Sequence, residues 1–272
     1  LEYVNNSFES AEEQAAFDVY DANNINPLYG FFVARAGLGA SESMRSKLAE
    51  YNDPRLSRAF ITKQGTSGKE QAPGTADNAV YAPNGTPEQG TSKYGTSLFM
   101  YSISAPTLLL SYHELKFLEA EALCRLERDA KSALKDAVVA GLLNAENSFT
   151  ISRKELGKTL INAASSITEA EAESYFDNTI EAKYTAEPLK TTMTQKYFAL
   201  WGASGEATES YNDVRRMKGL GENFIELKNP NSFPLRCPYG NSDTTTNAEV
   251  KAAYGNGQYV YSENVWWAGG SR

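Results

Sequence analysis

The sequence predicts a mainly α-helical fold, and three features of its 272 residues favour that class. Apolar side chains recur at spacings of three and four residues in several separate segments, which is the period of one helix face. Two of these segments follow each other with only a short link between them. An apolar fraction of 41% is ordinary for a globular protein and is sufficient for a core.

The first elements are expected to be helices near the start of the chain. Ser10 followed by Glu13 fits a capping box, so a helix is predicted from there to Asn23, with a short helix after it. A further helix is predicted over residues 41–51, where the apolar residues share one face. Pro54 ends this segment, because proline disfavours helix in the residue before it.

A long loop is predicted over about residues 62–98. This segment is rich in Gly, Pro, Thr, Ser and Asn, which sustain neither a helix nor burial in a core. Long ordered loops in compact proteins often carry function, so we expect this one to contribute to a binding site.

The clearest helix is expected over residues 111–126, and a second one follows it at once. Asp129 is suited to cap this second helix, in which small residues allow two helices to approach closely. Such an antiparallel pair is the building unit of tetratricopeptide-like stacks, although no clean 34-residue period is present. The sequence therefore predicts a helical-repeat scaffold interrupted by long irregular loop insertions.

Three later helices are expected around residues 176–184, 193–201 and 211–217. From about residue 218 to 272 the periodicity is lost among Pro, Gly, Asn and Tyr, apart from a short strand expected at 258–261. We expect this tail to wrap over the helices, so that residues 1–272 form a single domain.

Charge and composition exclude two classes of partner. With 26 basic and 34 acidic side chains the net charge is −8, which repels nucleic acid and anionic lipid headgroups. No stretch approaches the roughly 20 apolar residues that a membrane span needs. The chain starts at Leu1 without a leader sequence and is interpreted as processed or truncated.

Cys124 and Cys237 are expected to be free thiols, since one lies in a helical pattern and the other in a turn-rich segment.

The sequence offers no convincing catalytic or metal site. His113 is the only histidine, which removes most metal sites and any triad that needs an imidazole base. Glu114 and Glu121 are seven residues apart on one helix face, which makes them the candidates for the paired acids of a glycosidase. Pairing with arginine, for example Glu121 with Arg125, is the stronger interpretation. We therefore assign no catalytic residue.

No cofactor signature is present, and neither a phosphate-binding glycine loop nor a Cys-x-x-Cys pair occurs. Asn241, Asp243 and Asn247 form an oxygen-rich segment that leaves room for a structural calcium ion. Their spacing departs from the EF-hand pattern, and the glutamate that ends that pattern is lacking.

The aromatic residues are the best candidates for ligand contact among 16 Tyr, 12 Phe and 3 Trp. Tyr81 and Tyr94 lie in the predicted long loop, and Tyr259, Trp266 and Trp267 lie in the tail. Sugars present apolar C–H faces that stack on aromatic rings, while amides, carboxylates and guanidinium groups bond to the hydroxyls. We expect the loop pair to matter more than the tail, because the loop has no other evident task.

Several segments together resemble one known family. Residues 108–122 read LLLSYHELKFLEAEA, which is similar to the signature helix of the SusD/RagB lipoproteins. Residues 52–56 (NDPRL), 195–200 (QKYFAL) and 211–216 (YNDVRR) agree with that family in the same order. The final NVWW at 264–267 resembles the end of its SusD-like branch. The resemblance covers nearly the whole chain and identifies it as the C-terminal half of such a protein.

The resemblance implies a non-catalytic protein held by a lipid anchor at the outer face of the outer membrane. It implies a SusC-like TonB-dependent transporter as partner and an oligosaccharide or peptide as ligand. The anchor and the N-terminal helical units of the family are absent from this chain.

Two alternatives stay open at this point. An all-helical glycoside hydrolase would need two carboxylates facing each other across a deep cleft. A helical-repeat scaffold for protein or peptide partners would show a broad groove without aromatic platforms.

Overall fold

The structure is a computed structural model that describes residues 7–35, 38–64, 69–71, 81–85, 94–157, 160–161, 164–203, 205–228 and 232–270. The chain divides into two compact units, Leu1–Leu227 and Lys228–Arg272. The expectation of one domain with a wrapping tail therefore stays a prediction. Much of the predicted long loop, including residues 72–80 and 86–93, lies outside the described residues.

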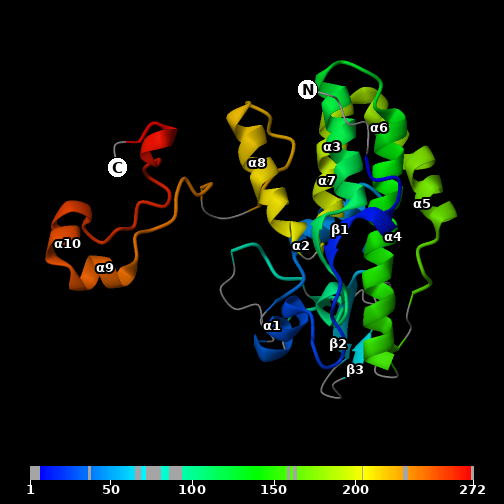
Figure 1. Ribbon diagram of the computed structural model, residues 1–272, viewed down its shortest axis with the longest axis horizontal. Coiled ribbons are helices and arrows are strands. Elements are labelled where there is room, and N and C mark those ends of the chain that lie inside the picture. Colours follow the sequence, from blue (N-terminus) through cyan, green and yellow to red (C-terminus); the bar gives the residue numbers. More distant parts are fainter. Residues whose placement is uncertain are drawn as a thin grey trace. The chain divides into compact units, whose positions relative to one another are not determined.

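The first unit is mainly helical, as predicted (Figure 1). Its α-helices are α1 Pro27–Arg35, α2 Glu42–Glu50, α3 Tyr112–Arg125, α4 Lys131–Leu156, α5 Glu169–Tyr175, α6 Glu181–Ala186, α7 Pro188–Ala199 and α8 Glu209–Gly219. Shorter helical turns are η1 Ala11–Glu13, η2 Pro54–Ser57, η4 Leu98–Tyr101 and η7 Glu206–Thr208, and a π-helical turn, η6 Phe176–Ile180, joins α5 to α6.

The predicted antiparallel helix pair is confirmed as α3 and α4. Ser111 caps α3, because its hydroxyl accepts the backbone N–H of Glu114 at 3.0 Å. Helix α7 packs against both, and the three run side by side in Figure 1. A Cβ added at Gly141 would lie 2.9 Å from the Cβ of Ala199, so glycine is what allows α4 to approach α7 so closely.

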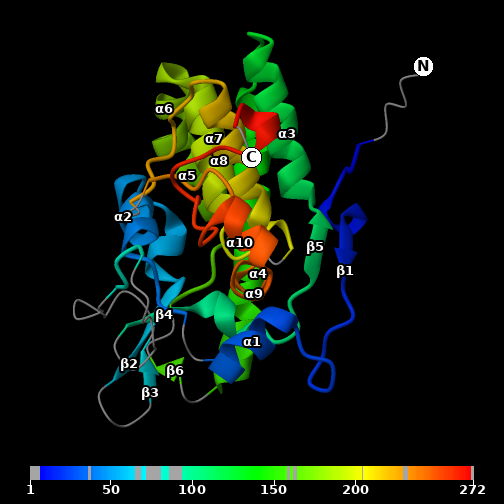
Figure 2. The ribbon, with the colours of Figure 1, turned by 90° about the vertical axis from the view of Figure 1, so that its left-hand side faces the viewer.

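The prediction of a helix from Ser10 to Asn23 is wrong. Ser10 does cap a helical turn, but only the three residues of η1 follow it. The chain then forms strand β1 Ala15–Phe17, which pairs antiparallel with β5 Thr107–Leu110 (Figure 2). Pairing with a strand about ninety residues away outweighs the local helix signal here.

The other strands lie partly inside the segment predicted as loop. They form a sheet in the order β4 Thr96–Ser97, β2 Phe60–Gln64, β3 Lys69–Gln71 and β6 Leu160–Ile161, in which only β3 and β6 are parallel. The prediction of a loop over about residues 62–98 misses these short strands.

The second unit contains α9 Asn241–Thr246, α10 Ala248–Tyr254 and the turn η8 Trp266–Ala268. The rings of Tyr239 and Tyr254 stack with centroids 4.4 Å apart, and the Arg236 guanidinium lies 4.6 Å from the Tyr239 ring. The strand expected at 258–261 is wrong, since residues 258 and 259 are irregular and residues 260–262 form a turn, in which the Val260 carbonyl accepts the backbone N–H of Leu235 at 2.8 Å.

Both cysteines are free thiols, as expected, with Cys124 half-buried and Cys237 exposed. None of the helices in the described part of the chain combines the length and the apolar character that crossing a bilayer requires.

A buried ion pair joins the turn after α2 to the helical stack. The Arg55 guanidinium donates to both carboxylate oxygens of Asp53 at 2.9 and 2.7 Å, and these side chains are 2% and 0% exposed. Arg55 also donates to the carbonyl of Phe198 at 2.7 Å, and the Tyr175 hydroxyl donates to Asp53 at 3.3 Å. The pair therefore fixes η2 against the ends of α5 and α7.

A second buried cluster links the first turn of α3 to α7 and α8. Lys196 of α7 lies 2.8 Å from Asp213 and 3.9 Å from Glu114, while Glu206 accepts the N–H of Ser111 and lies 3.6 Å from His113. Burial, followed by the adjacent Glu206 carboxylate, raises the pKa of Glu114 to about 8 against the opposing effect of Lys196.

Farther along α3, Glu121 sits between two arginines. Arg125 donates to Glu121 at 2.6 Å and to Glu222, while Arg216 of α8 forms a two-oxygen pair with Glu121. Although burial acts to raise the pKa of Glu121, Arg216 and Arg125 outweigh it and lower this pKa. The expected pairing of Glu121 with Arg125 is confirmed.

We expect Arg55→Met to lower the free energy of unfolding by about 3–5 kcal/mol, because it leaves the Asp53 carboxylate buried without its charge partner. Urea denaturation measures this. Arg215→Met removes an exposed arginine from α8 and should change stability by less than about 1 kcal/mol. Equal effects of the two substitutions would contradict the role given to the buried pair.

Glu114 should make stability fall as pH rises. In the folded protein Glu114 keeps its proton up to about pH 8, whereas the unfolded chain releases it near pH 4.5. The folded state therefore binds more protons between these values, and its stability decreases across that window. Denaturation series at pH 5 and pH 8.5 should show a smaller decrease for Glu114→Gln than for the wild type. Glu119→Gln, exposed on the same helix, should follow the wild type, and parallel behaviour of all three would refute the assignment.

Candidate functional site

The two aromatic residues expected to lead ligand contact, Tyr81 and Tyr94, are packed in the first unit. Tyr94 is 5% exposed. Tyr81 is half-buried, with its ring edge-on to Phe60 at 5.3 Å and the Arg45 guanidinium 5.1 Å from its centroid. Burial raises the pKa of the Tyr81 hydroxyl, against the effect of Arg45. Packing thus covers much of both rings, and their role in ligand binding stays a prediction.

The tail tryptophans are the opposite case. Trp266 and Trp267 are 70% and 68% exposed, and their rings meet edge to face with centroids 5.5 Å apart. Two edge-to-face indoles offer two differently oriented aromatic faces, which suits a ligand with more than one sugar ring.

Glycines set the turn that carries these indoles. Gly269 adopts a left-handed φ of 86° and donates its N–H to the Trp266 carbonyl at 3.2 Å. A Cβ at Gly270 would lie 1.9 Å from the Asn264 carbonyl oxygen, so no other residue fits there without a shift of the backbone. Tyr259, the third tail candidate, is half-buried.

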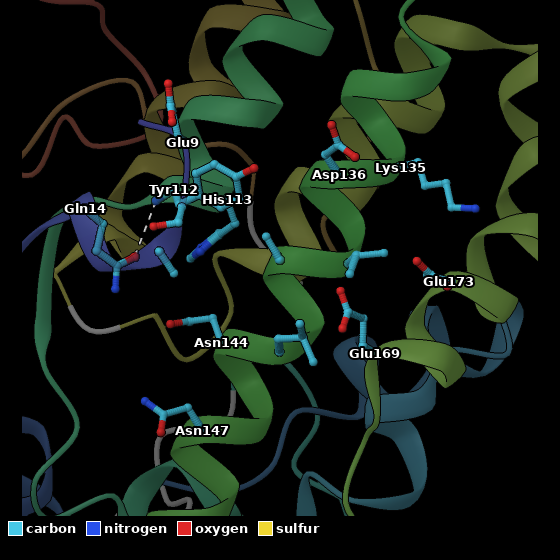
Figure 3. Close-up of a pocket in the computed structure, with 15 residues that line it drawn as sticks. Glu9, Gln14, Tyr112, His113, Lys135, Asp136, Asn144, Asn147, Glu169 and Glu173 are labelled. Atoms are coloured by element: carbon cyan, nitrogen blue, oxygen red, sulfur yellow. Dashed lines mark hydrogen bonds between the residues drawn. The ribbon is translucent and has the colours of Figure 1, made fainter. Parts of the chain in front are cut away.

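The first unit also contains a cavity of about 560 Å³ that sequence reasoning missed (Figure 3). Its floor is one face of α4, and its sides come from residues 9–14, the start of α3 and α5. In Figure 3 Gln14 and Tyr112 lie on one side, with Glu169 and Glu173 on the other. The volume is within the range of pockets that hold small ligands.

Paired apolar residues on α4 were the signal that could have revealed this cavity. Val138 and Leu142 are buried against neighbouring helices, whereas the adjacent Val139 and Leu143 are only half-buried and line the cavity. A helix with apolar residues on two faces has two surfaces to cover. Only one of them was used in the sequence prediction.

The acids considered for catalysis are engaged in structure. Glu114 and Glu121 are 6% and 5% exposed and belong to the buried clusters around α3. His113 borders the cavity but is 1% exposed, and burial followed by the positive charge of Arg55 lowers its pKa to about 3. It is therefore neutral at physiological pH.

The oxygen-rich segment considered for calcium is helical in the structure. Asn241 and Asp243 belong to α9, and Asn247 uses its side-chain oxygen to cap α10 through the N–H groups of Glu249 and Val250. Across the described residues, no group of three or more His, Cys, Asp or Glu side chains is placed to hold a metal ion.

Comparison with known proteins gives one family match and several structural matches. The model of a family described as "Starch-binding associating with outer membrane" matches residues 2–239. No curated protein matches the chain. A crystal structure of a SusD/RagB family protein from Bacteroides thetaiotaomicron VPI-5482 is 65% identical with a TM-score of 0.87, and the alignment covers 98% of this chain and 57% of that one.

Two more distant structures share the fold. A SusD homolog from Bacteroides fragilis NCTC 9343 is 19% identical with a TM-score of 0.60, and the match covers 93% of this chain and 57% of that one. A Bacteroidetes AC2a SusD-like protein is 17% identical with a TM-score of 0.59, covering 96% and 62%.

This chain thus spans a little over half the length of these relatives. The family model covers most of the chain, and the 65% identical protein aligns with nearly all of it, in agreement with the motifs at 52–56, 108–122, 195–200 and 211–216. The chain therefore belongs to the SusD-like family of outer-membrane-associated binding proteins.

Proposed function

We propose that this chain is part of a cell-surface protein that binds a glycan and delivers it to a SusC-like TonB-dependent transporter of the outer membrane. The family is one of non-catalytic binding proteins, and its description as starch-binding and associated with the outer membrane supports this proposal. Attachment through a lipid at a preceding N-terminal segment belongs to the same proposal.

The single observation that carries the glycan proposal is the exposed pair Trp266 and Trp267. Exposure of large aromatic rings to water is unfavourable, and contact with a ligand removes this cost. Indole faces match the C–H faces of sugars. Each stacked ring contributes on the order of 1 kcal/mol. Because a shallow site buries little of a hydrated sugar, such rings supply much of the total affinity.

Tyr81, Tyr94 and Tyr259 remain proposed ligand contacts, and their burial bears on how they are ranked. Tyr94 is almost fully buried, and Tyr81 and Tyr259 are half-buried. A buried ring contributes to folding more than to ligand contact, so we now rank the two tryptophans ahead of these tyrosines.

The hydrolase alternative has little support from the arrangement of acids. The two carboxyl groups considered for it, on Glu114 and Glu121, are held by lysine, arginine and other buried side chains. Hydrolysis of a glycosidic bond needs one acid and one base free on either side of the substrate.

We expect Trp266→Ala and Trp267→Ala each to weaken binding of the cognate glycan several-fold while leaving Tm nearly unchanged. Isothermal titration calorimetry against a panel of soluble glycans measures the first effect, and thermal unfolding measures the second. Tyr211→Ala, which removes an exposed ring from α8, is the matched control and should bind normally. Unchanged affinity in the double tryptophan variant would place the glycan site elsewhere.

Substitution of the tyrosines should lower stability more, and glycan affinity less, than substitution of the tryptophans. Tyr94→Ala is expected to lower the free energy of unfolding by about 3 kcal/mol, as deletion of a buried aromatic ring does. Tyr81→Ala should lower Tm less than Tyr94→Ala does. It should also weaken glycan binding less than Trp266→Ala does. A larger loss of affinity in a folded Tyr81→Ala protein than in Trp266→Ala would restore the order expected from the sequence.

A further inference from the structure

We propose that Glu114 and Glu206 share one proton, and that this proton makes the contact between the α7–α8 connection and the first turn of α3 sensitive to pH. This contact is called here the carboxyl latch. Glu114 lies in the first turn of α3, and Glu206 begins η7 within the connection. They are 6% and 2% exposed, buried by elements of this chain alone, so the latch depends on no surface that a longer protein would cover. The latch is also independent of the glycan proposal.

The backbone holds Glu206 tightly against the start of α3. The η7 turn follows Gly205, whose φ of 93° is left-handed, and a Cβ at this glycine would lie 2.1 Å from the carbonyl oxygen of Leu108 in β5. One carboxylate oxygen of Glu206 accepts the backbone N–H of Ser111, the residue that caps α3. Glu206 therefore fixes the connection at the point where β5 ends and α3 begins.

The second carboxylate oxygen of Glu206, Oε2, has no hydrogen-bond partner among the described residues. His113 Nε2 lies 3.6 Å from it, which is too far for a hydrogen bond. A buried oxygen without a donor is costly. The Glu114 carboxyl group is within reach of Glu206, and a carboxyl group donates only when it carries a proton. A proton on Glu114 thus supplies the missing donor.

The buried charges lead to the same proton. Lys196 of α7 is the cation beside Glu114, but its Nζ is 3.9 Å from that carboxyl group and 2.8 Å from Asp213 of α8. Within the described part of the chain, no other lysine or arginine forms a salt bridge with Glu114 or Glu206. Two ionised carboxylates here would share part of one cation. Their repulsion in a site with little water favours retention of one proton.

The remaining charged neighbours favour a proton on the carboxyl pair over one on the imidazole. Glu209, at the start of α8, adds negative charge and acts to raise the pKa of Glu114. Burial, followed by Glu206, brings this pKa to about 8. In contrast, burial and then the positive charge of Arg55 lower the pKa of His113 to about 3. At neutral pH the proton therefore belongs to the two carboxyl groups.

The latch should weaken as pH rises from about 5 to about 8. The closed connection keeps the proton up to about pH 8, whereas an open one exposes Glu114 to water, where it ionises near pH 4.5. Since the closed form binds more protons in this window, each pH unit favours opening by up to about ten-fold. Arg216 pairs with Glu121 and Met217 is buried farther along α8, so opening should be confined to η7 and the first turn of α8.

Infrared spectroscopy of the full-length protein tests the proton directly, because a protonated carboxyl group has a C=O stretch separate from the bands of carboxylates. At pH 7 the wild type should show a protonated-carboxyl band that Glu114→Gln removes. The matched control Glu119→Gln, at an exposed position on α3, should keep it. In Glu206→Gln the band should disappear at a lower pH than in the wild type, because the second negative charge is gone. A wild type without the band, or an unchanged midpoint in Glu206→Gln, would overturn the shared proton.

Hydrogen exchange followed by mass spectrometry tests the effect on the connection. Between pH 5 and pH 7.5, after correction for the intrinsic pH dependence of exchange, protection of residues 206–212 should fall by up to about ten-fold per pH unit in the wild type. Glu114→Gln keeps a donor for Glu206 at every pH, so its protection there should not change with pH. Residues 214–219 are the internal control and should stay protected in both proteins.

Two outcomes of the exchange experiment would refute the latch. One is the same pH dependence over residues 206–212 in the wild type and in Glu114→Gln, and the other is an equal loss of protection over residues 214–219. If Glu206→Gln does not fold, carbon NMR of the wild type replaces it. The carboxyl carbons of Glu114 and Glu206 should then both shift at the pH at which the infrared band is lost. A Glu206 carbon that does not respond there would refute the sharing.

Discussion

The buried pair of Asp53 and Arg55 is the contact on which the arrangement of the first unit depends. Asp53 also caps η2 by accepting the N–H of Arg55, so one carboxylate both begins the turn and neutralises the guanidinium. Arg55 also donates to the Phe198 carbonyl in the last turn of α7, which fixes the position of η2 relative to that helix. Because α7 packs on α3 and α4, the position of this single charge pair is coupled to the helical stack.

Helices α7 and α8 are in turn connected to α3 by ion pairs. Lys196 of α7 and Arg216 of α8 provide positive charge to acids of α3, and Glu206 holds the connection between α7 and α8 against the start of α3. Both buried acids of α3 are structural, because arginines neutralise Glu121 and Glu114 keeps its proton at neutral pH. Ligand contact is thereby left to other, more exposed positions.

Local signals explain why much of the fold could be predicted from the sequence. Ser41 and Ser111 cap α2 and α3, Asp129 accepts the backbone N–H of Lys131 at the start of α4, and apolar periodicity marks the α3–α4 pair, so these helices could be predicted from local sequence. The stretch after Ser10 carried a cap as well, but strand pairing with residues 107–110 decided its structure. Such pairing between distant segments leaves no mark on the local sequence.

The candidate sites were harder to predict, because exposure is a property of the folded chain. Tyr94 and Trp266 both lie in irregular sequence, yet one is buried and the other exposed. The cavity on α4 is lined by residues from four separate segments, which only the folded chain brings together. The family motifs predicted the fold, but they did not predict which side chains are exposed or line the cavity.

The central claim is that this protein holds a glycan without transforming it, and one NMR experiment tests both halves. Saturation-transfer difference spectra of an oligosaccharide panel with the full-length protein report binding, while the anomeric signals of the same samples report cleavage. The account predicts transfer to the protons of at least one oligosaccharide, with constant reducing-end signals over a day. Growth of new reducing-end signals, or the absence of transfer from every glycan tested, would contradict it.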